Sequence, residues 1–138
     1  MPLSDADLNE FTQLLSMDLE NGDTDKVVAL FQYNTDLYET LGHLMSGGNM
    51  FVRLGINMVL EDLKAVKPED MPLAIAFLTP LLKHENPTIR GDVADIFSII
   101  GNQEQIELLK PLLQDEHPQV REMAEEAIEA LMNSDEEE

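Results

Sequence analysis

The sequence contains no cysteine and no tryptophan, and aromatic residues make up only 5% of its 138 residues. Without cysteine the chain can form no disulfide, no cysteine-based zinc site and no catalytic thiol, which suits a reducing compartment. No run approaches the ~18 apolar residues of a membrane-spanning helix, and no basic and apolar signal segment opens the chain. We therefore expect a cytoplasmic protein that does not enter a membrane.

Basic residues are also scarce. Eight Lys and Arg residues face 28 Asp and Glu residues, which gives a formal net charge of −20. Such a surface repels nucleic-acid phosphates and anionic membranes, so we expect neither as a direct partner. It would attract a basic protein. An acidic surface can also serve solubility alone, and the sequence leaves both interpretations open.

One sequence unit occurs twice between Leu78 and Met132. LTPLLKHENPTIRGDVADIFSIIG is followed by LKPLLQDEHPQVREMAEEAIEALM, and equivalent residues lie 31 positions apart. Each copy has apolar residues at i, i+3, i+4 and then at i, i+4, i+8, i+11, which is typical of two amphipathic helices. Pro87 and Pro118 open the second helix, where proline suits the first turn. A repeat of helix pairs is therefore predicted.

Two earlier repeats follow the same pattern less closely. Apolar residues in 35–64 lie 37 positions before their equivalents in the first copy, and a weaker match covers 4–34. The first helix of that weaker repeat carries the apolar stripe Leu8, Phe11, Leu14 and Leu15. Because one repeat of this size cannot bury its own stripe, neighbouring repeats must supply the core, and the outermost repeats should act as caps.

The prediction is an all-α fold of about eight helices in four pairs. A single domain, 1–132, contains repeats at about 4–34, 35–64, 69–101 and 102–132. The acidic residues 133–138 are expected to form a disordered tail.

All three arginines, Arg53, Arg90 and Arg121, occupy the same position of the repeat, early in the second helix. A guanidinium offers five donors in a rigid fork, so it can reach a carboxylate or a helix-end carbonyl of an adjacent repeat. We expect a structural role, and a row of arginines that binds an anion or acidic peptide is the alternative. Candidate acceptors lie near the loops between paired helices: Glu85, Asp115 and Glu116.

Methionine and phenylalanine cluster where the repeat at 35–64 enters its second helix. Met50 and Phe51 stand where the later copies have Pro-Thr and Pro-Gln, and Met45 and Met58 are near them in sequence. Methionine is adaptable and often serves binding surfaces. Packing against the first repeat explains the cluster equally well, so Met50 and Phe51 are candidates for partner binding or for the core.

Sequence motifs of catalysis and cofactor binding are missing. His43, His84 and His117 occupy three different repeat positions and form no repeated ligand set. The chain has no phosphate-binding glycine loop and no signature of an activated nucleophile. We therefore predict no enzyme activity, no metal and no cofactor.

The motifs PLL-x₄-NP-x₂-R and PLL-x₄-HP-x₂-R resemble HEAT-repeat proteins, in particular the short repeats of phycobilisome-lyase-type HEAT proteins. Pro80 and Pro111 match the proline bend in the first helix of that family. The resemblance implies a right-handed α-α superhelix, a HEAT-like solenoid that acts as a scaffold for partner proteins. Deoxyhypusine hydroxylase is similar in fold and holds two irons with His-Glu motifs directly after this arginine. None of the three arginines here is followed by His-Glu, so the iron site is not carried over.

The resemblance also implies that the second helices line the concave face. A non-catalytic scaffold or adaptor that docks a basic protein partner on this acidic face is the function we predict. One alternative is an accessory subunit of an enzyme or lyase, which positions a modified protein or pigment. Another is an acidic inhibitor that mimics a nucleic acid. Candidate partner-binding residues on the second helices, besides Met50 and Phe51, are Asn57, Glu61, Asp92, Asp95, Ser98 and Glu125.

Overall fold

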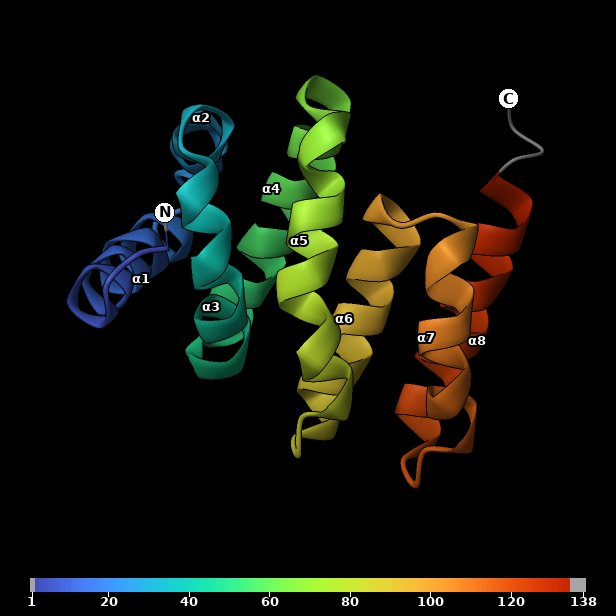
Figure 1. Ribbon diagram of the computed structural model, residues 1–138. Helices are drawn as coiled ribbons and strands as arrows, with labels where there is room; N and C mark the ends of the chain where they lie inside the picture. Colours follow the sequence, from blue (N-terminus) through green and yellow to red (C-terminus); the bar gives the residue numbers. More distant parts are fainter. Residues whose placement is uncertain (1, 135–138) are drawn as a thin grey trace. The chain divides into compact units, whose positions relative to one another are not determined.

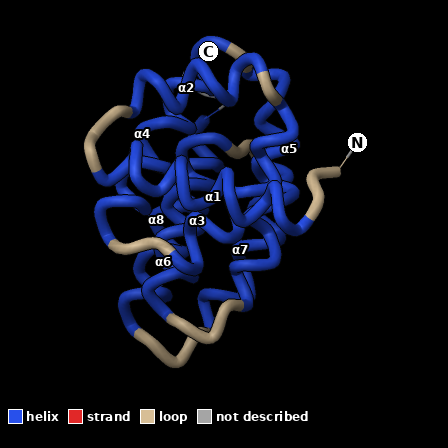
Figure 2. Tube along the Cα trace, turned by 90° about the vertical axis from the view of Figure 1, so that its left-hand side faces the viewer, coloured by secondary structure: helices blue, strands red, loops and turns tan. Residues whose placement is uncertain are grey.

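The computed structural model describes residues 2–134, and this part of the chain forms helices and connecting turns without a strand (Figure 2). The all-α fold of paired helices predicted from the apolar spacing is confirmed. No helix in the described range is long and apolar enough to cross a membrane. The chain divides into two compact units, unit 1 (residues 1–77) and unit 2 (residues 78–138). The division falls inside the predicted repeat at 69–101, within its first helix.

Unit 1 is built around one long helix, α4 (Met50–Val66), which packs against α1, α2 and α3 (Figure 1). The predicted first helix of the second repeat is in fact a 3₁₀ helix that continues as a short α-helix, η1 and α3. The remaining elements are α1 (Asp5–Glu20), α2 (Thr24–Tyr33), η1 (Thr35–Thr40), α3 (Leu41–Gly47), η2 (Pro68–Asp70) and α5 (Met71–Leu78). The last residue of α5, Leu78, already belongs to unit 2.

Two side-chain caps and one glycine set helix ends in unit 1. The Ser4 hydroxyl accepts a hydrogen bond from the Asp7 amide at 3.1 Å and caps α1. The Asn49 side chain accepts one from the Val52 amide at 3.0 Å and caps α4. After α1, Gly22 takes a φ of 81°, the left-handed conformation that glycine adopts at helix C-termini. These features fix where α1 starts and stops and where α4 starts.

The core of unit 1 is formed mainly by apolar residues of α2, η1, α3 and α4. Phe31 and Tyr38 are fully buried, and their rings meet edge to face with centroids 5.1 Å apart. Leu41, Leu44 and Met45 are fully buried as well. On α4 the buried residues recur at the helical spacing expected of a second helix: Val52, Ile56, Val59, Leu60 and Leu63.

The prediction that the apolar stripe of α1 faces the core is wrong in part. Leu15 and Leu19 are buried, whereas Phe11 and Leu14 are 36% and 51% exposed. The reason is that α1 packs on α4 through Leu19, which lies so close to Gly55 that a Cβ there would be 2.9 Å from Leu19 Cδ2. This contact turns a second apolar face of α1 away from the core.

Unit 2 contains the two copies of the clearest repeat. Just before Pro80 and Pro111 the first helix of each pair changes from α to 3₁₀ geometry, because proline lacks the N–H that an α-helix needs. Helix α6 packs against α8 and η3, and α8 packs against α7 and η5. The elements are η3 (Thr79–Lys83), α6 (Pro87–Ile100), η4 (Gln103–Gln105), α7 (Ile106–Leu109), η5 (Lys110–Gln114) and α8 (Pro118–Asn133).

The interior of unit 2 follows the predicted stripes closely. Leu82 and Leu112 are buried, and their neighbours Leu81 and Leu113 are half-buried. Helices α6 and α8 contribute the buried residues Ile89, Val93, Phe97, Ile100, Val120, Ala124 and Leu131. Helix α8 continues through Asn133, one residue past the predicted end of the domain. The rest of the predicted acidic tail, residues 135–138, lies outside the described residues.

Candidate interaction surface

Four large apolar side chains point outward from one face of α4. Met50, Phe51, Leu54 and Met58 are 56%, 62%, 56% and 56% exposed. Their spacing places them on adjoining turns of the helix, on the side opposite the buried Ile56. We call these four residues the α4 stripe. The cluster that the sequence left undecided therefore lies on the surface at Met50, Phe51 and Met58, whereas its fourth member, Met45, belongs to the core.

The α4 stripe has no counterpart on α6 or α8, the second helices of the two later repeats. The residues 37 positions after Phe51, Leu54 and Met58, and those a further 31 positions on, are small or polar. They are Thr88, Gly91 and Asp95 in α6 and Gln119, Glu122 and Glu126 in α8. The apolar character of these positions in α4 is thus not required by the repeat.

Sequence reasoning missed Leu54 and did not include Met58 among the candidates. A signal was present: once Val52, Ile56 and Leu60 are assigned to the buried stripe, Leu54 and Met58 remain as a second apolar row with i, i+4 spacing. Comparison of the repeats strengthens that signal, because α4 has apolar residues at positions where α6 and α8 have small or polar ones.

The predicted polar site residues are not all brought together. Glu61 is exposed and follows Met58 by three residues, so it borders the α4 stripe, and Asn57 is half-buried on the same helix. In unit 2, Asp92 lines a shallow hollow of about 300 Å³ with Gly91 and Met123.

The other predicted polar residues of unit 2 lie elsewhere. Asp95 and Ser98 are half-buried on α6, and the Ser98 hydroxyl donates to the Asp95 carbonyl. Glu125 lines a different hollow, with Leu113 and Ile128. The structure therefore does not bring Glu125 together with Asp92.

The shared arginine position makes the same contact in all three repeats. Nη1 of Arg53 donates to the Gly48 carbonyl at 2.9 Å, Nη1 of Arg90 to the His84 carbonyl at 2.7 Å, and Nη1 of Arg121 to the Asp115 carbonyl at 2.6 Å. Each accepting residue is the C-cap of the first helix in the same repeat. The arginine thus satisfies a helix-end carbonyl that would otherwise lack a partner. The expected contact with a helix end is present, but it lies within the arginine's own repeat.

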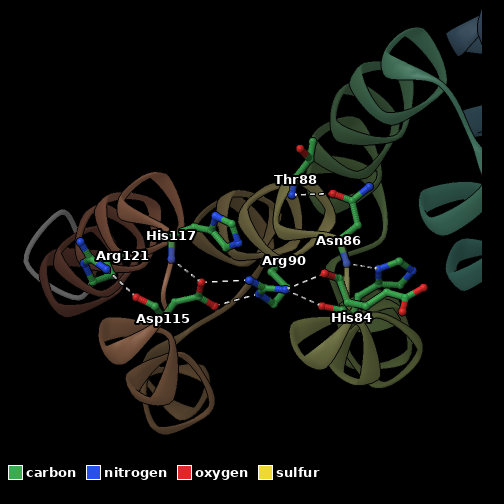
Figure 3. A network of polar contacts seen from close by, with 8 residues as sticks. His84, Asn86, Thr88, Arg90, Asp115, His117 and Arg121 are labelled. Carbon is green, nitrogen blue, oxygen red and sulfur yellow. Dashed lines mark hydrogen bonds and ion pairs between the residues drawn. The ribbon is translucent and has the colours of Figure 1, made fainter.

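Arg90 also binds the next repeat through a bidentate ion pair (Figure 3). Its Nε and Nη2 donate to the two carboxylate oxygens of Asp115 at 2.8 and 2.9 Å, and both side chains are largely buried, at 12% and 9% exposure. Asp115 Oδ1 also accepts from the His117 amide at 3.0 Å, next to the start of α8. Of the three candidate acceptors, Asp115 binds Arg90 through its side chain and Glu85 through its backbone carbonyl.

This ion pair favours the charged form of both partners. The hydrogen bond from Arg90 lowers the pKa of Asp115, and the hydrogen bond from the His117 amide lowers it further, while partial burial acts in the opposite direction. The same bond raises the pKa of Arg90. Both groups are therefore charged across the neutral range, which supports a structural role for this contact.

The three histidines have separate surroundings. His43 is exposed on α3, and the ring nitrogen Nδ1 of His84 accepts from the Asn86 amide at 3.0 Å in the turn before α6. His117 is the N-cap residue of α8. Across residues 2–134 no three His, Asp or Glu side chains are grouped so that they could hold a metal ion.

Comparison with known proteins identifies one relationship. A family model described as HEAT repeats matches residues 57–129, which is more than half of the chain. No curated protein and no solved structure matches the sequence.

Proposed function

This chain belongs to the HEAT-repeat family, and we propose that it is a non-catalytic scaffold that docks a basic protein partner through the α4 stripe. HEAT repeats are generally protein-interaction scaffolds, because stacked helix pairs present extended surfaces. The observation that carries the proposal is the set of four outward apolar side chains on α4, at positions where the repeat does not require them.

The size of the stripe makes it an anchor for a larger interface. Full burial of one such side chain yields about 1.5–3 kcal/mol, so covering four half-exposed ones yields on the order of 3–6 kcal/mol. Association itself costs at least about 4 kcal/mol in lost translational and rotational freedom. The stripe alone therefore gives weak binding, and further contacts are needed for a stable complex.

Charge supplies the further contacts in this proposal. Glu61 and Asp62 are exposed and follow Met58 by three and four residues, so carboxylates border the stripe. With a net charge of −20, the protein attracts and orients a partner that carries Lys and Arg around apolar anchors. Asp92 and Asp95 belong to unit 2 and are proposed as a separate acidic contact of the same kind.

An affinity purification with matched variants tests the proposal. The bait is the full chain, expressed in its native cells, and bound proteins are quantified by mass spectrometry. The test variant combines Phe51→Gln, Leu54→Glu and Met58→Glu, which gives α4 the residues that α8 carries at the same repeat positions. The control is Leu108→Glu, an exposed leucine on α7 outside the proposed surface.

The expected result is a set of basic proteins that wild type and Leu108→Glu retain and the triple variant loses. Because added glutamates strengthen the attraction to a basic protein, such a loss must come from the missing apolar contacts. Higher salt should weaken the capture. The proposal is wrong if the triple variant captures the same proteins as wild type, and competition of the captured set by DNA would favour the nucleic-acid mimic.

A further inference from the structure

Helices α1 and α2 of unit 1 border an open apolar groove of about 710 Å³. Phe11, Leu14 and Met17 of α1 line it together with Leu30 of α2. The buried Leu15 also contributes to the lining. The groove shares no residue with the α4 stripe, so it is a separate feature of unit 1.

The groove is open because α1 has more apolar surface than its neighbours cover. Leu15 and Leu19 face the core at 3% exposure, while Leu14 and Met17 are 51% and 60% exposed. A terminal repeat normally has a polar outer face, since nothing stacks on it. Helix α1 therefore does not have the outer face of a cap, and its apolar surface suits a further packed element.

The charged residues around the groove are mainly acidic. Asp7 and Asp18 lie on the same face of α1 as Phe11, four residues before it and seven after it, and Asp36 lines the groove from η1. Among the described residues that line the groove, Lys26 is the one cation, and its Nζ pairs with Asp18 Oδ1 at 3.2 Å. Asp7 and Asp36 are both exposed, so the groove favours a ligand with positive charges outside an apolar centre.

We propose that this groove binds an amphipathic helix of a partner protein. The apolar face of the helix, with residues at i, i+4 and i+7, covers Phe11, Leu14 and Met17, and its flanking Lys or Arg side chains pair with Asp7 and Asp36. An apolar groove between two helices is the kind of surface into which an amphipathic helix packs, and about 710 Å³ accommodates several large side chains. A second copy of this chain is the less suitable occupant, because two molecules of net charge −20 repel each other.

A designed peptide tests the proposal with the full-length protein. The probe is a fluorescein-labelled amphipathic peptide with leucines at i, i+4 and i+7 and lysines on the flanks, and its twin has glutamate at each lysine position. Binding is measured by fluorescence anisotropy. The variants are Leu14→Glu in the groove, Leu54→Glu in the α4 stripe and Leu108→Glu as a control on α7. All three replace an exposed leucine and add the same charge, and circular dichroism verifies their helix content.

We expect Leu14→Glu to weaken binding of the lysine peptide by about tenfold or more, while Leu108→Glu binds as the wild type does. General attraction between a cationic peptide and an acidic protein cannot produce this pattern, since the variants carry equal charge. The glutamate twin should not bind.

Three results overturn the inference. If all variants bind equally, the peptide does not use the groove. If Leu54→Glu abolishes binding and Leu14→Glu does not, the peptide sits on the α4 stripe, and the proposed function stands without this second site. If light scattering shows a wild-type dimer that Leu14→Glu converts to a monomer, the groove holds a second copy of the chain.

Discussion

Units 1 and 2 use the same repeat but present different surfaces. In both, an arginine early in a second helix donates to the C-cap carbonyl of the preceding first helix. Among the described residues, ten of the twelve exposed large apolar side chains belong to unit 1, and only Leu108 and Met132 belong to unit 2. Helix α8 of unit 2 instead exposes Glu122, Glu125, Glu126 and Glu129.

The comparison separates what the repeat needs from what it permits. The buried stripe and the capped helix end recur because each helix pair must hide its apolar face and satisfy its terminal carbonyls. The outward positions have no such constraint, so they can differ from one repeat to the next. Function is therefore to be sought where the outward residues diverge, as in α1 and α4.

The largest effect should distinguish the two faces of α4. Replacing the fully buried Ile56 with alanine leaves a cavity and should cost about 2–5 kcal/mol of unfolding free energy. Leu54→Glu on the outward face should change it by no more than about 0.5 kcal/mol. Urea unfolding followed by circular dichroism measures both. A large loss of stability in Leu54→Glu would show that the stripe supports the fold, and the comparison between units would fail.

The next effect concerns the arginine position. Arg90→Ala should destabilise the protein by about 1–3 kcal/mol, because it removes the bidentate partner of the buried Asp115 and a capping donor. Arg121→Ala should cost less, since Arg121 makes one hydrogen bond within the described residues. Urea midpoints of the two variants provide the test, and equal losses would mean that the ion pair adds nothing to the capping contact.

The ion pair should also make unit 2 sensitive to acid. Because Arg90 lowers the folded-state pKa of Asp115, the bond stabilises the protein fully above the unfolded value of about 4. That contribution is lost as the pH falls through the lowered pKa. The stability difference between wild type and Asp115→Asn should therefore be constant near neutral pH and shrink below about pH 4. Urea midpoints at a series of pH values measure it, and a difference that persists in acid would contradict the assignment.

The smallest effect lies in the core of unit 1. The hydroxyl of Tyr38 is buried without a hydrogen-bond partner among the described residues, and burial together with the charge of Asp70 raises the pKa of Tyr38. Tyr38→Phe keeps the ring that packs on Phe31 and removes the unsatisfied group, so stability should be unchanged or higher by up to about 1 kcal/mol. Thermal unfolding measures the change, and a clear loss would reveal a bonded hydroxyl, for example to an internal water.

Much of the fold was predictable because local chemistry and periodicity act over short distances. Ser4, Asn49 and Asn86 cap their helices as side chains of this type do, and the stripe of Ile89, Val93 and Phe97 is buried as its spacing predicts. The candidate site was harder to predict. Met50 and Phe51 were identifiable as unusual, but their exposure depends on which neighbours cover α4.

The face of α1 could not be predicted for a similar reason. Leu8, Phe11, Leu14, Leu15 and Leu19 make α1 apolar over a wide arc, and periodicity alone does not tell which part of that arc is buried. Contact with α4 decided the matter, because Gly55 lets Leu19 approach closely. The partner of Arg90 was open in the same way, since three nearby acids were equally plausible until the turns were placed.

The sequence by itself determined the helix pairs, the repeat period and the single position that all three arginines occupy, because these depend on residues close together in the chain. Only the tertiary structure decided that Asp115 receives Arg90, that α1 turns Leu14 outward and that the α4 stripe is exposed. The physical reason is that burial and ion pairing depend on packing between segments distant in sequence, which periodicity does not encode.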